Sequence, residues 1–257
     1  MKPRGLVEAW AAGLSTVGAS CKIASALVAE CVASTGFDYI YIDQQHGVFD
    51  DQELLSMLQA VAAGGAAPVT RVPSNRPELI HKSLDFGADG VIVPLVETEA
   101  DAVRALEACR YPPTGRRSYG VLRPRMSAEI GGYQPACIVL VETATGIANL
   151  DAIARTGVDA IMVGPHDLSL SLGLSVVDAG PGSPELVAAI DQVVAACARY
   201  GVVAGIGSSS GHEAAVWLKR GFRLVNVGND LGYIRTSLAT QLARARSALP
   251  SGGLNGS

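Results

Sequence analysis

Residues 137–167 read CIVLVETATGIANLDAIARTGVDAIMVGPHD, and this stretch is the most informative about the fold. Two short apolar runs, Cys137–Val141 and Ala160–Val163, flank a segment with helical periodicity, Ile147–Ala154. A buried strand, a helix and a second buried strand are typical of one unit of a parallel sheet. The stretch therefore predicts an α/β protein.

The same alternation continues along the rest of the chain. We expect strands at Thr16–Ala19, Tyr39–Ile42, Pro68–Val72, Gly90–Val93, Cys137–Val141, Ala160–Val163, Val202–Gly205 and Leu224–Val227. We expect helices between them at Ile23–Ser34, Asp51–Ala63, Pro77–Phe86, Glu99–Cys109, Ile147–Ala154, Pro184–Tyr200, Gly211–Lys219 and Tyr233–Ala248. Such a series fits a closed (β/α)8 TIM barrel, which routinely uses about 250 residues as a single domain. The sequence predicts one barrel over residues 1–250 and a disordered tail over 251–257.

The composition limits the classes of function. The chain is 49% hydrophobic and only 17% charged, which favours a large core and buried subunit contacts, so we expect a homo-oligomer. A net charge of −4 without a run of Lys or Arg argues against nucleic acid as a partner. The five cysteines form no CxxC pair, and no segment has the ~18 consecutive apolar residues of a membrane helix. We therefore expect a cytoplasmic protein with no membrane partner.

Carboxylates follow two neighbouring predicted strands. Glu142 comes directly after the first apolar run of the quoted stretch, and Asp167 lies shortly after the second. Because parallel strands of a barrel end at one rim, both side chains are expected there, and oxygen ligands suit a divalent cation. Asp is also strongly preferred as a helix N-cap. On the residues alone, Asp167 could fill either role.

Further polar residues at predicted strand ends point to the same rim, namely Asp43-Gln-Gln-His46, Arg71 and Gly164-Pro-His-Asp167. Polar residues at this end of a barrel are favoured for catalysis. The backbone around Gly164, Pro165 and His166 opens a predicted helix at Asp167, so its free N–H groups could bind a carboxylate.

Five motifs, taken together, resemble the HpcH/HpaI class II aldolases, and the resemblance covers nearly the whole chain. The motifs are FDYIYIDQQHG at 37–47, RVPS at 71–74, CRYPPTGRRSYG at 109–120, VET at 141–143 and VGPHDLS at 163–169. This resemblance implies a barrel that uses a divalent metal to cleave 4-hydroxy-2-oxo acids reversibly to pyruvate and an aldehyde, through a metal-stabilised enolate.

The resemblance also implies roles for single residues. Glu142 and Asp167 would ligate Mg²⁺, Mn²⁺ or Co²⁺. Arg71 would lie beside the keto oxygen of pyruvate, and His46 would act as the base, oriented by Asp85. On the residues alone, Asp85 could equally be a solvated residue at a helix end.

Three positions depart from the pattern common in the family. Gln45 stands where many members have Glu, Leu140 stands where many have Gln, and His166 replaces a small residue. His166 could contact the aldehyde, bind the metal or shield the site.

Other functions were compared with the aldolase. The same site could serve a synthase or transferase that condenses another 2-oxo acid donor, such as oxaloacetate, with a keto acid or thioester. A Schiff-base mechanism is disfavoured, because none of the four lysines, Lys2, Lys22, Lys82 and Lys219, falls on a predicted strand. The resemblance further implies a hexamer, a trimer of dimers that exchange their last helix, and the apolar segment 233–249 is compatible with it.

Two further segments allow alternative interpretations. The arginines of the long loop, Arg116, Arg117, Arg123 and Arg125, could bind an acidic acceptor such as a semialdehyde carboxylate or could form subunit salt bridges. Ser208–Gly211 could form a phosphate cradle, but it lacks a paired Lys, so we expect a turn and a helix start there.

Overall fold

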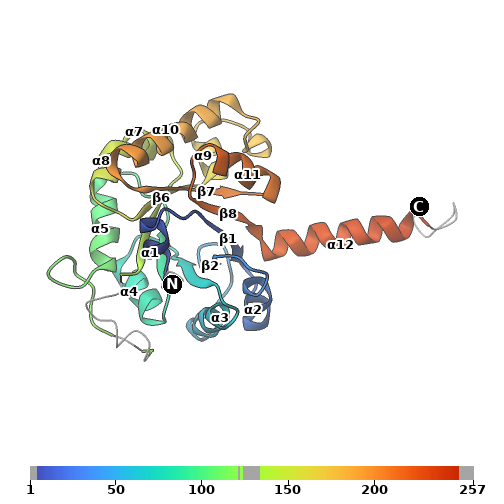
Figure 1. The fold of residues 1–257 in the computed structure, drawn as a ribbon, viewed down its shortest axis with the longest axis horizontal. Coiled ribbons are helices and arrows are strands. Elements are labelled where there is room, and N and C mark those ends of the chain that lie inside the picture. The colour runs from blue at the N-terminus through green and yellow to red at the C-terminus, as the bar shows by residue number, and fades with distance from the viewer. Residues whose placement is uncertain (1–4, 121, 124–133, 249–257) are drawn as a thin grey trace.

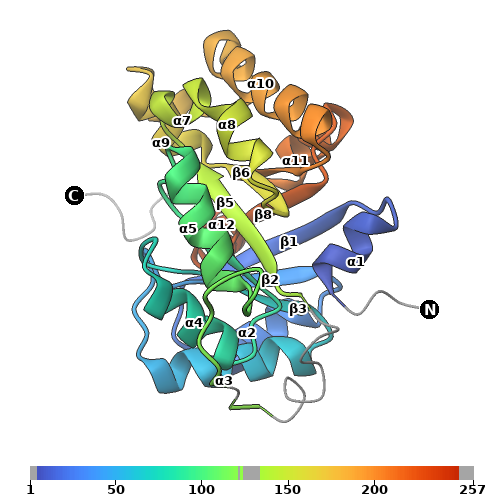
Figure 2. The same ribbon diagram turned by 90° about the vertical axis from the view of Figure 1, so that its left-hand side faces the viewer.

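The computed structural model describes residues 5–120, 122–123 and 134–248, and eight parallel strands close into a barrel in chain order (Figures 1 and 2). Each strand pairs with the next one, and β1 pairs with β8 to close the sheet. The strands are β1 (Thr16–Cys21), β2 (Tyr39–Asp43), β3 (Ala67–Arg71), β4 (Gly90–Val93), β5 (Ala136–Val141), β6 (Ala160–Val163), β7 (Val203–Ser208) and β8 (Leu224–Asn229). The predicted (β/α)8 barrel is confirmed.

Helices cover the outside of this barrel (Figures 1 and 2). The helices of the described residues are α1 (Leu6–Ala11), α2 (Ala26–Ala33), α3 (Asp51–Ala63), α4 (Pro77–Asp85), α5 (Glu99–Cys109), α7 (Ala144–Ala148), α8 (Leu150–Arg155), α9 (Pro165–Ser171), the 3₁₀ turn η1 (Val176–Asp178), α10 (Pro184–Tyr200), α11 (Gly211–Lys219) and α12 (Asp230–Arg246), of which α1 and α12 do not lie on the outer wall. The predicted disordered tail, 251–257, lies outside the described residues.

The strands are buried on both faces and sort their side chains into two layers. On β5, Ile138 and Leu140 point into the barrel, whereas Val139 and Val141 pack under the outer helices. Burial on both faces explains why these strands read as continuous apolar runs rather than as alternating ones.

The amino-terminal helix α1 closes one end of the barrel. Leu6 and Trp10 of α1 belong to the inner apolar cluster, and Trp10 Nε1 donates a hydrogen bond to Thr16 Oγ1 at 3.0 Å, at the start of β1. The end of the barrel where the strands begin is thus filled, which leaves the end where they finish for a binding site.

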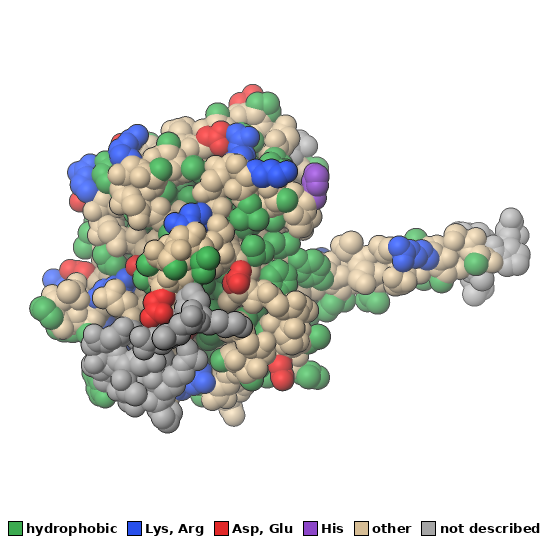
Figure 3. Space-filling view, in the orientation of Figure 1, with side chains coloured by type: hydrophobic (Ala, Val, Ile, Leu, Met, Phe, Trp, Pro, Cys, Tyr) green, Lys and Arg blue, Asp and Glu red, His purple; other side chains and the backbone are tan. Residues whose placement is uncertain are grey.

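The last helix, α12, projects away from the barrel (Figure 1). Only its first residue, Asp230, is buried, and Ile234, Leu238 and Leu242 are exposed. Hydrophobic side chains are visible along this arm in Figure 3. Among the described residues, no helix is both long and apolar enough to cross a membrane.

Candidate active site

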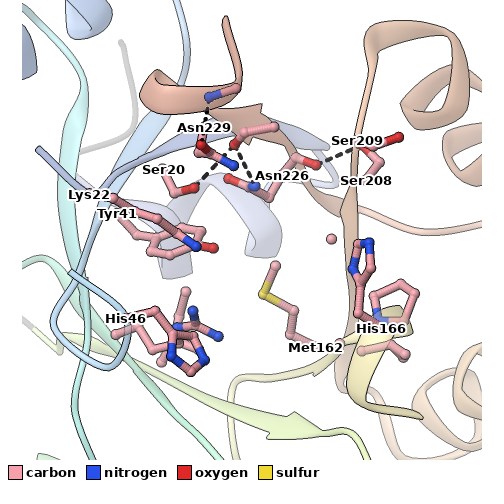
Figure 4. A pocket seen from close by; sticks show the side chains of 18 of the residues that line it. Ser20, Lys22, Tyr41, His46, Met162, His166, Ser208, Ser209, Asn226 and Asn229 are labelled. Atoms are coloured by element: carbon pink, nitrogen blue, oxygen red, sulfur yellow. Dashed lines mark hydrogen bonds between the residues drawn. The ribbon is translucent and has the colours of Figure 1, made fainter. Parts of the chain in front are cut away.

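A cavity of about 680 Å³ lies at the carboxyl ends of the strands. This volume falls in the range of small-molecule sites. Figure 4 shows its lining side chains, with His166 on one side and His46 on the other. Most of the predicted site residues line this cavity, namely His46, Arg71, Glu142, Gly164, Pro165, His166 and Asp167.

Glu142, which is buried, and Asp167, which is exposed, form an acidic pair. Glu142 follows β5 and is 2% exposed, and Asp167 lies in α9, after β6. The pKa of Glu142 is raised to about 7, first by burial and also by the negative charge of Asp167, against the lowering effects of the Leu95 N–H and Arg71. Two carboxylates held this close need a proton or a cation between them.

The backbone is shaped around the Glu142 carboxylate. The N–H of Leu95 donates to Glu142 Oε1 at 3.0 Å, and Leu95 adopts a left-handed conformation with φ +53°. Such a conformation is costly for leucine and clusters at functional sites. On the other side, a Cβ on Gly164 would lie 2.7 Å from Glu142 Oε2, so this close approach requires glycine.

Asp43 holds Arg71 at the cavity wall. Arg71 Nε and Nη2 donate to the two carboxylate oxygens of Asp43 at 2.8 and 2.6 Å, and Asp43 is fully buried. Burial alone would raise the pKa of Asp43, but the hydrogen bonds and charge of Arg71, together with the charge of Lys22, lower it below its ordinary value. A bidentate guanidinium is strongly fixed in orientation.

The carboxylate beside His46 is Asp43 rather than the expected Asp85. The backbone N–H of His46 donates to Asp43 Oδ1 at 3.3 Å. Asp85 instead accepts a hydrogen bond from Arg117 Nη2 at 2.8 Å and does not line the cavity. Asp85 ends α4, and a helix that returns along the barrel ends far from the rim where strands finish. That Asp85 orients His46 therefore stays a prediction.

Helix α9 begins at Pro165, two residues earlier than expected. Gly164 is its N-cap and Asp167 is its third residue, so Asp167 does not serve as the N-cap. Since proline at the first position has no N–H, the backbone groups of His166 and Asp167 are the free donors at this helix start.

The donor set at Glu142 fits a hard divalent cation. The two carboxylates supply oxygen ligands, and the adjoining cavity leaves room for water and a chelating substrate. Within the described part of the chain, no group of three or more His, Cys, Asp or Glu residues has the arrangement of a metal cluster. The chain would thus provide the two ligands Glu142 and Asp167.

Sequence reasoning missed a polar wall on the β1 and β8 side of the cavity, formed by Ser20, Lys22, Asn226 and Asn229. It also gave Asp43 no role beyond that of a polar residue at the rim, although this residue directly follows a predicted strand three positions before His46, which was the available signal. The arginine candidates lie elsewhere, since Arg117 pairs with Asp85 and Arg116 with Glu107. Arg125 lies outside the described residues.

The serine loop after β7 is a helix start, as expected. Ser210 caps α11 by accepting a hydrogen bond from the N–H of Glu213. The N–H and hydroxyl of Ser209 donate to the Glu213 carboxylate at 2.7 and 2.6 Å. A carboxylate of the chain itself therefore takes the donors that a phosphate would need.

The fold and this site define a barrel with an acidic pair and a fixed arginine at its rim. The chain belongs to the HpcH/HpaI aldolase/citrate lyase family, whose model matches residues 21–237. The resemblance in the motifs is thereby confirmed.

Individual relatives cover nearly the whole chain. A protein of Salmonella paratyphi A named 5-keto-4-deoxy-D-glucarate aldolase is 35% identical over 244 residues, which cover 91% of this chain and 94% of that protein. A solved HpcH/HpaI aldolase/citrate lyase family protein from Burkholderia cenocepacia is 32% identical with a TM-score of 0.82, covering 91% of this chain and 95% of that one. The structure of the citrate synthase SbnG is 27% identical with a TM-score of 0.84, covering 95% and 98%.

Proposed function

We propose that this protein is a divalent-metal-dependent class II aldolase that reversibly cleaves 4-hydroxy-2-oxo acids to pyruvate and an aldehyde. The observation that carries the proposal is the pair formed by the buried Glu142 and the more exposed Asp167, beside the fixed guanidinium of Arg71. Mg²⁺, Mn²⁺ and Co²⁺ are the ions we propose for the acidic pair.

The residues around Glu142 and Asp167 each contact a different part of the proposed pyruvate. A cation held by Glu142 and Asp167 would supply Lewis-acid stabilisation of the negative charge that develops on the C2 oxygen. Arg71 adds a permanent positive charge near this oxygen, in an orientation fixed by Asp43. The N–H groups that open α9, at His166 and Asp167, bind the pyruvate carboxylate.

His46 is the proposed proton acceptor. In the cleavage direction it takes the proton of the 4-hydroxyl, and that oxygen becomes the aldehyde carbonyl as the C3–C4 bond breaks. The electron pair of this bond passes to the enolate of pyruvate, which is then protonated at C3. An imidazole has one nitrogen that can accept a proton and can return it, which suits both directions of this transfer.

The names of the relatives suggest a class of substrate. 5-Keto-4-deoxy-D-glucarate is a hydroxylated diacid, and counted from its keto end it is a 4-hydroxy-2-oxo acid. We propose that this chain acts on acidic, sugar-derived compounds of this class, as a cytoplasmic homo-oligomer built as a hexamer from three dimers.

Exchange of the pyruvate methyl protons tests this proposal. In deuterated water, NMR should show exchange when Mg²⁺, Mn²⁺ or Co²⁺ is added and no exchange with EDTA. Pyruvate should then condense with aldehydes in a screen run under the same conditions. Lack of exchange with every ion would contradict the proposal.

The likeness to the citrate synthase SbnG favours a second candidate, a synthase or transferase. Such an enzyme would join a different 2-oxo acid donor, for instance oxaloacetate, to a keto acid or thioester. Product analysis with both donors separates the two candidates, since the aldolase releases an aldehyde from a 4-hydroxy-2-oxo acid and the synthase does not.

A further inference from the structure

The β8–β1 wall of the cavity, formed by Ser20, Lys22, Asn226 and Asn229, has no part in the chemistry proposed so far. In a closed barrel of eight strands, β1 lies opposite β5, which carries Glu142 at its end. Figure 4 shows Ser20 with Lys22 on one side of it and Asn226 on the other. Pyruvate bound at the acidic pair would thus direct the rest of a longer substrate toward this wall.

An irregularity in the sheet builds the wall. Gly18 pairs with Asn226 and Ser20 with Asn229, so β8 contains one residue more than β1 over this stretch. Such a bulge re-aims side chains and is common beside active sites. The carbonyl of Gly228, in the bulge, accepts hydrogen bonds from Ser20 Oγ at 3.1 Å and from Asn226 Nδ2 at 3.0 Å.

Asn226 has a buried hydrogen-bond acceptor that no described residue pairs with. Its side chain is fixed by the bond from Nδ2 to Gly228, and the residue is only 4% exposed. Its Oδ1 atom is buried and has no hydrogen-bond partner among the described residues. Because such atoms are costly to leave unpaired, a donor from a ligand, such as a hydroxyl group, would satisfy it.

Lys22 presents a cation to the same space. Its backbone N–H and that of Ile23 donate to the buried carboxylate of Asp230 at 3.0 and 2.9 Å, which fixes the chain at this point. Its Nζ lies 3.5 Å from Asp43 Oδ2, longer than an ordinary hydrogen bond, and Asp43 is already engaged by Arg71. The ammonium group therefore keeps donors for a ligand.

The charged side chains around the cavity indicate which charge the ligand carries. Arg71 is balanced by Asp43, and the acidic pair would be balanced by a divalent cation. Lys22 then adds a positive charge that no other described lining residue balances. Recognition of a carboxylate by a lysine is favourable in such a partly buried place.

We propose that Lys22 and Asn226 form the subsite for the aldehyde half of the substrate and select a hydroxylated aldehyde that carries a carboxylate. Lys22 pairs with the carboxylate, and Asn226 Oδ1 accepts a hydrogen bond from the hydroxyl. This inference rests on the proposed aldolase function. A carboxylate is favoured over a phosphate, because Glu213 occupies the donors of the neighbouring serine loop.

Two aldehydes that differ only in their terminal group test the role of Lys22. Tartronate semialdehyde and glyceraldehyde share the three-carbon chain and the hydroxyl on C2, but the first ends in a carboxylate and the second in a neutral hydroxymethyl group. The wild-type protein should use tartronate semialdehyde with the higher kcat/KM. In Lys22→Met the ratio of the two kcat/KM values should fall about 10- to 100-fold, the worth of a hydrogen bond to a charged group. Lys22→Arg should keep most of the preference, and Lys82→Met, on the exposed face of α4, should keep all of it.

The hydroxyl is tested with glycolaldehyde and acetaldehyde. Asn226→Leu should lower the preference for glycolaldehyde, with a melting temperature that shows the barrel is folded. Glyceraldehyde 3-phosphate is included as a phosphorylated acceptor, and a preference for it over tartronate semialdehyde would overturn the choice of a carboxylate.

Two outcomes would overturn the inference and leave the aldolase intact. They are a wild-type enzyme without preference for the acidic aldehyde, and an equal loss with both aldehydes in Lys22→Met. Failure of pyruvate proton exchange with every metal would instead overturn the aldolase proposal, and this inference with it.

Discussion

Asp43 combines a stabilising and a functional role, because it fixes Arg71 and contacts the backbone of His46. Asp43→Asn should destabilise the protein by about 3–5 kcal/mol, the usual cost of removing one partner of a buried ion pair. Chemical denaturation at pH 7 measures this, with the exposed Asp51→Asn as a control that should cost little. A stability equal to that of the wild type would contradict the role assigned to Asp43.

The same variant should show a characteristic pH dependence. The pKa of Asp43 is lowered in the folded protein, so its contribution to stability is full above the unfolded pKa of about 4 and is lost as the pH falls through the folded value. The difference in unfolding free energy between the wild type and Asp43→Asn should thus shrink in acid. A difference that stays constant down to low pH would indicate that lost packing, rather than lost charge, destabilises the variant.

Glu142→Gln should separate metal binding from folding. The dissociation constant for Mn²⁺ should rise by about 100-fold, the upper end of what even outer-shell partners of a metal are worth. With EDTA the variant should melt at the same temperature as the wild type or higher, since a buried carboxylate beside Asp167 is replaced by a neutral amide. Glu97→Gln, which loses only a charged partner of Thr143, is the matched control. Unchanged Mn²⁺ affinity in Glu142→Gln would contradict its role as a ligand.

The sequence was sufficient to predict the site residues that lie at or just after the carboxyl ends of strands, because all of these ends meet at one rim of the barrel. His46, Arg71, Glu142 and Asp167 all line one cavity, as expected. Lys22 was not predicted, because β1 runs two residues beyond its expected end at Ala19 and brings Lys22 to the rim. Asn226 depends on a bulge set by the pairing of two strands far apart in the chain, and a sequence pattern does not reveal that register.

The turn from β6 into α9 positions the acidic pair through Gly164. In Gly164→Ala the added Cβ would lie 2.7 Å from Glu142 Oε2, so the carboxylate must move. We expect kcat/KM to fall about tenfold or more, because small misplacements in an active site are costly, while the barrel still folds. Gly182→Ala is the control, since a Cβ there meets nothing within 4 Å. Equal activity of both variants would show that this close approach is dispensable.

Regular elements were the most predictable part of the fold. The bounds of β4, β6, α3, α5, α10 and α11 coincide with those expected. The expected helix Ile147–Ala154 is instead two helices, α7 and α8, which meet at Asn149 as the C-cap of one and the N-cap of the other. Helix α1 was not expected, because its apolar side chains are explained only by the end of the barrel that they fill.

The projecting helix α12 is the surface on which assembly should depend. Ile234, Leu238 and Leu242 are exposed on it, and such apolar residues are unfavourable in water unless a second copy of the chain covers them. The double variant Leu238→Glu/Leu242→Glu should lose the oligomer in size-exclusion chromatography with light scattering, whereas Gln241→Glu on the same helix should keep it. A monomeric wild type, or a double variant with the wild-type mass, would contradict assembly through α12.

The acidic pair is tested most directly by a crystal structure of the protein grown with Mn²⁺ and pyruvate. Anomalous scattering should place the ion between the carboxylates of Glu142 and Asp167, with the pyruvate keto oxygen on the ion and Arg71 beside it. An ion bound elsewhere, or pyruvate bound away from these two carboxylates, would contradict the proposed function.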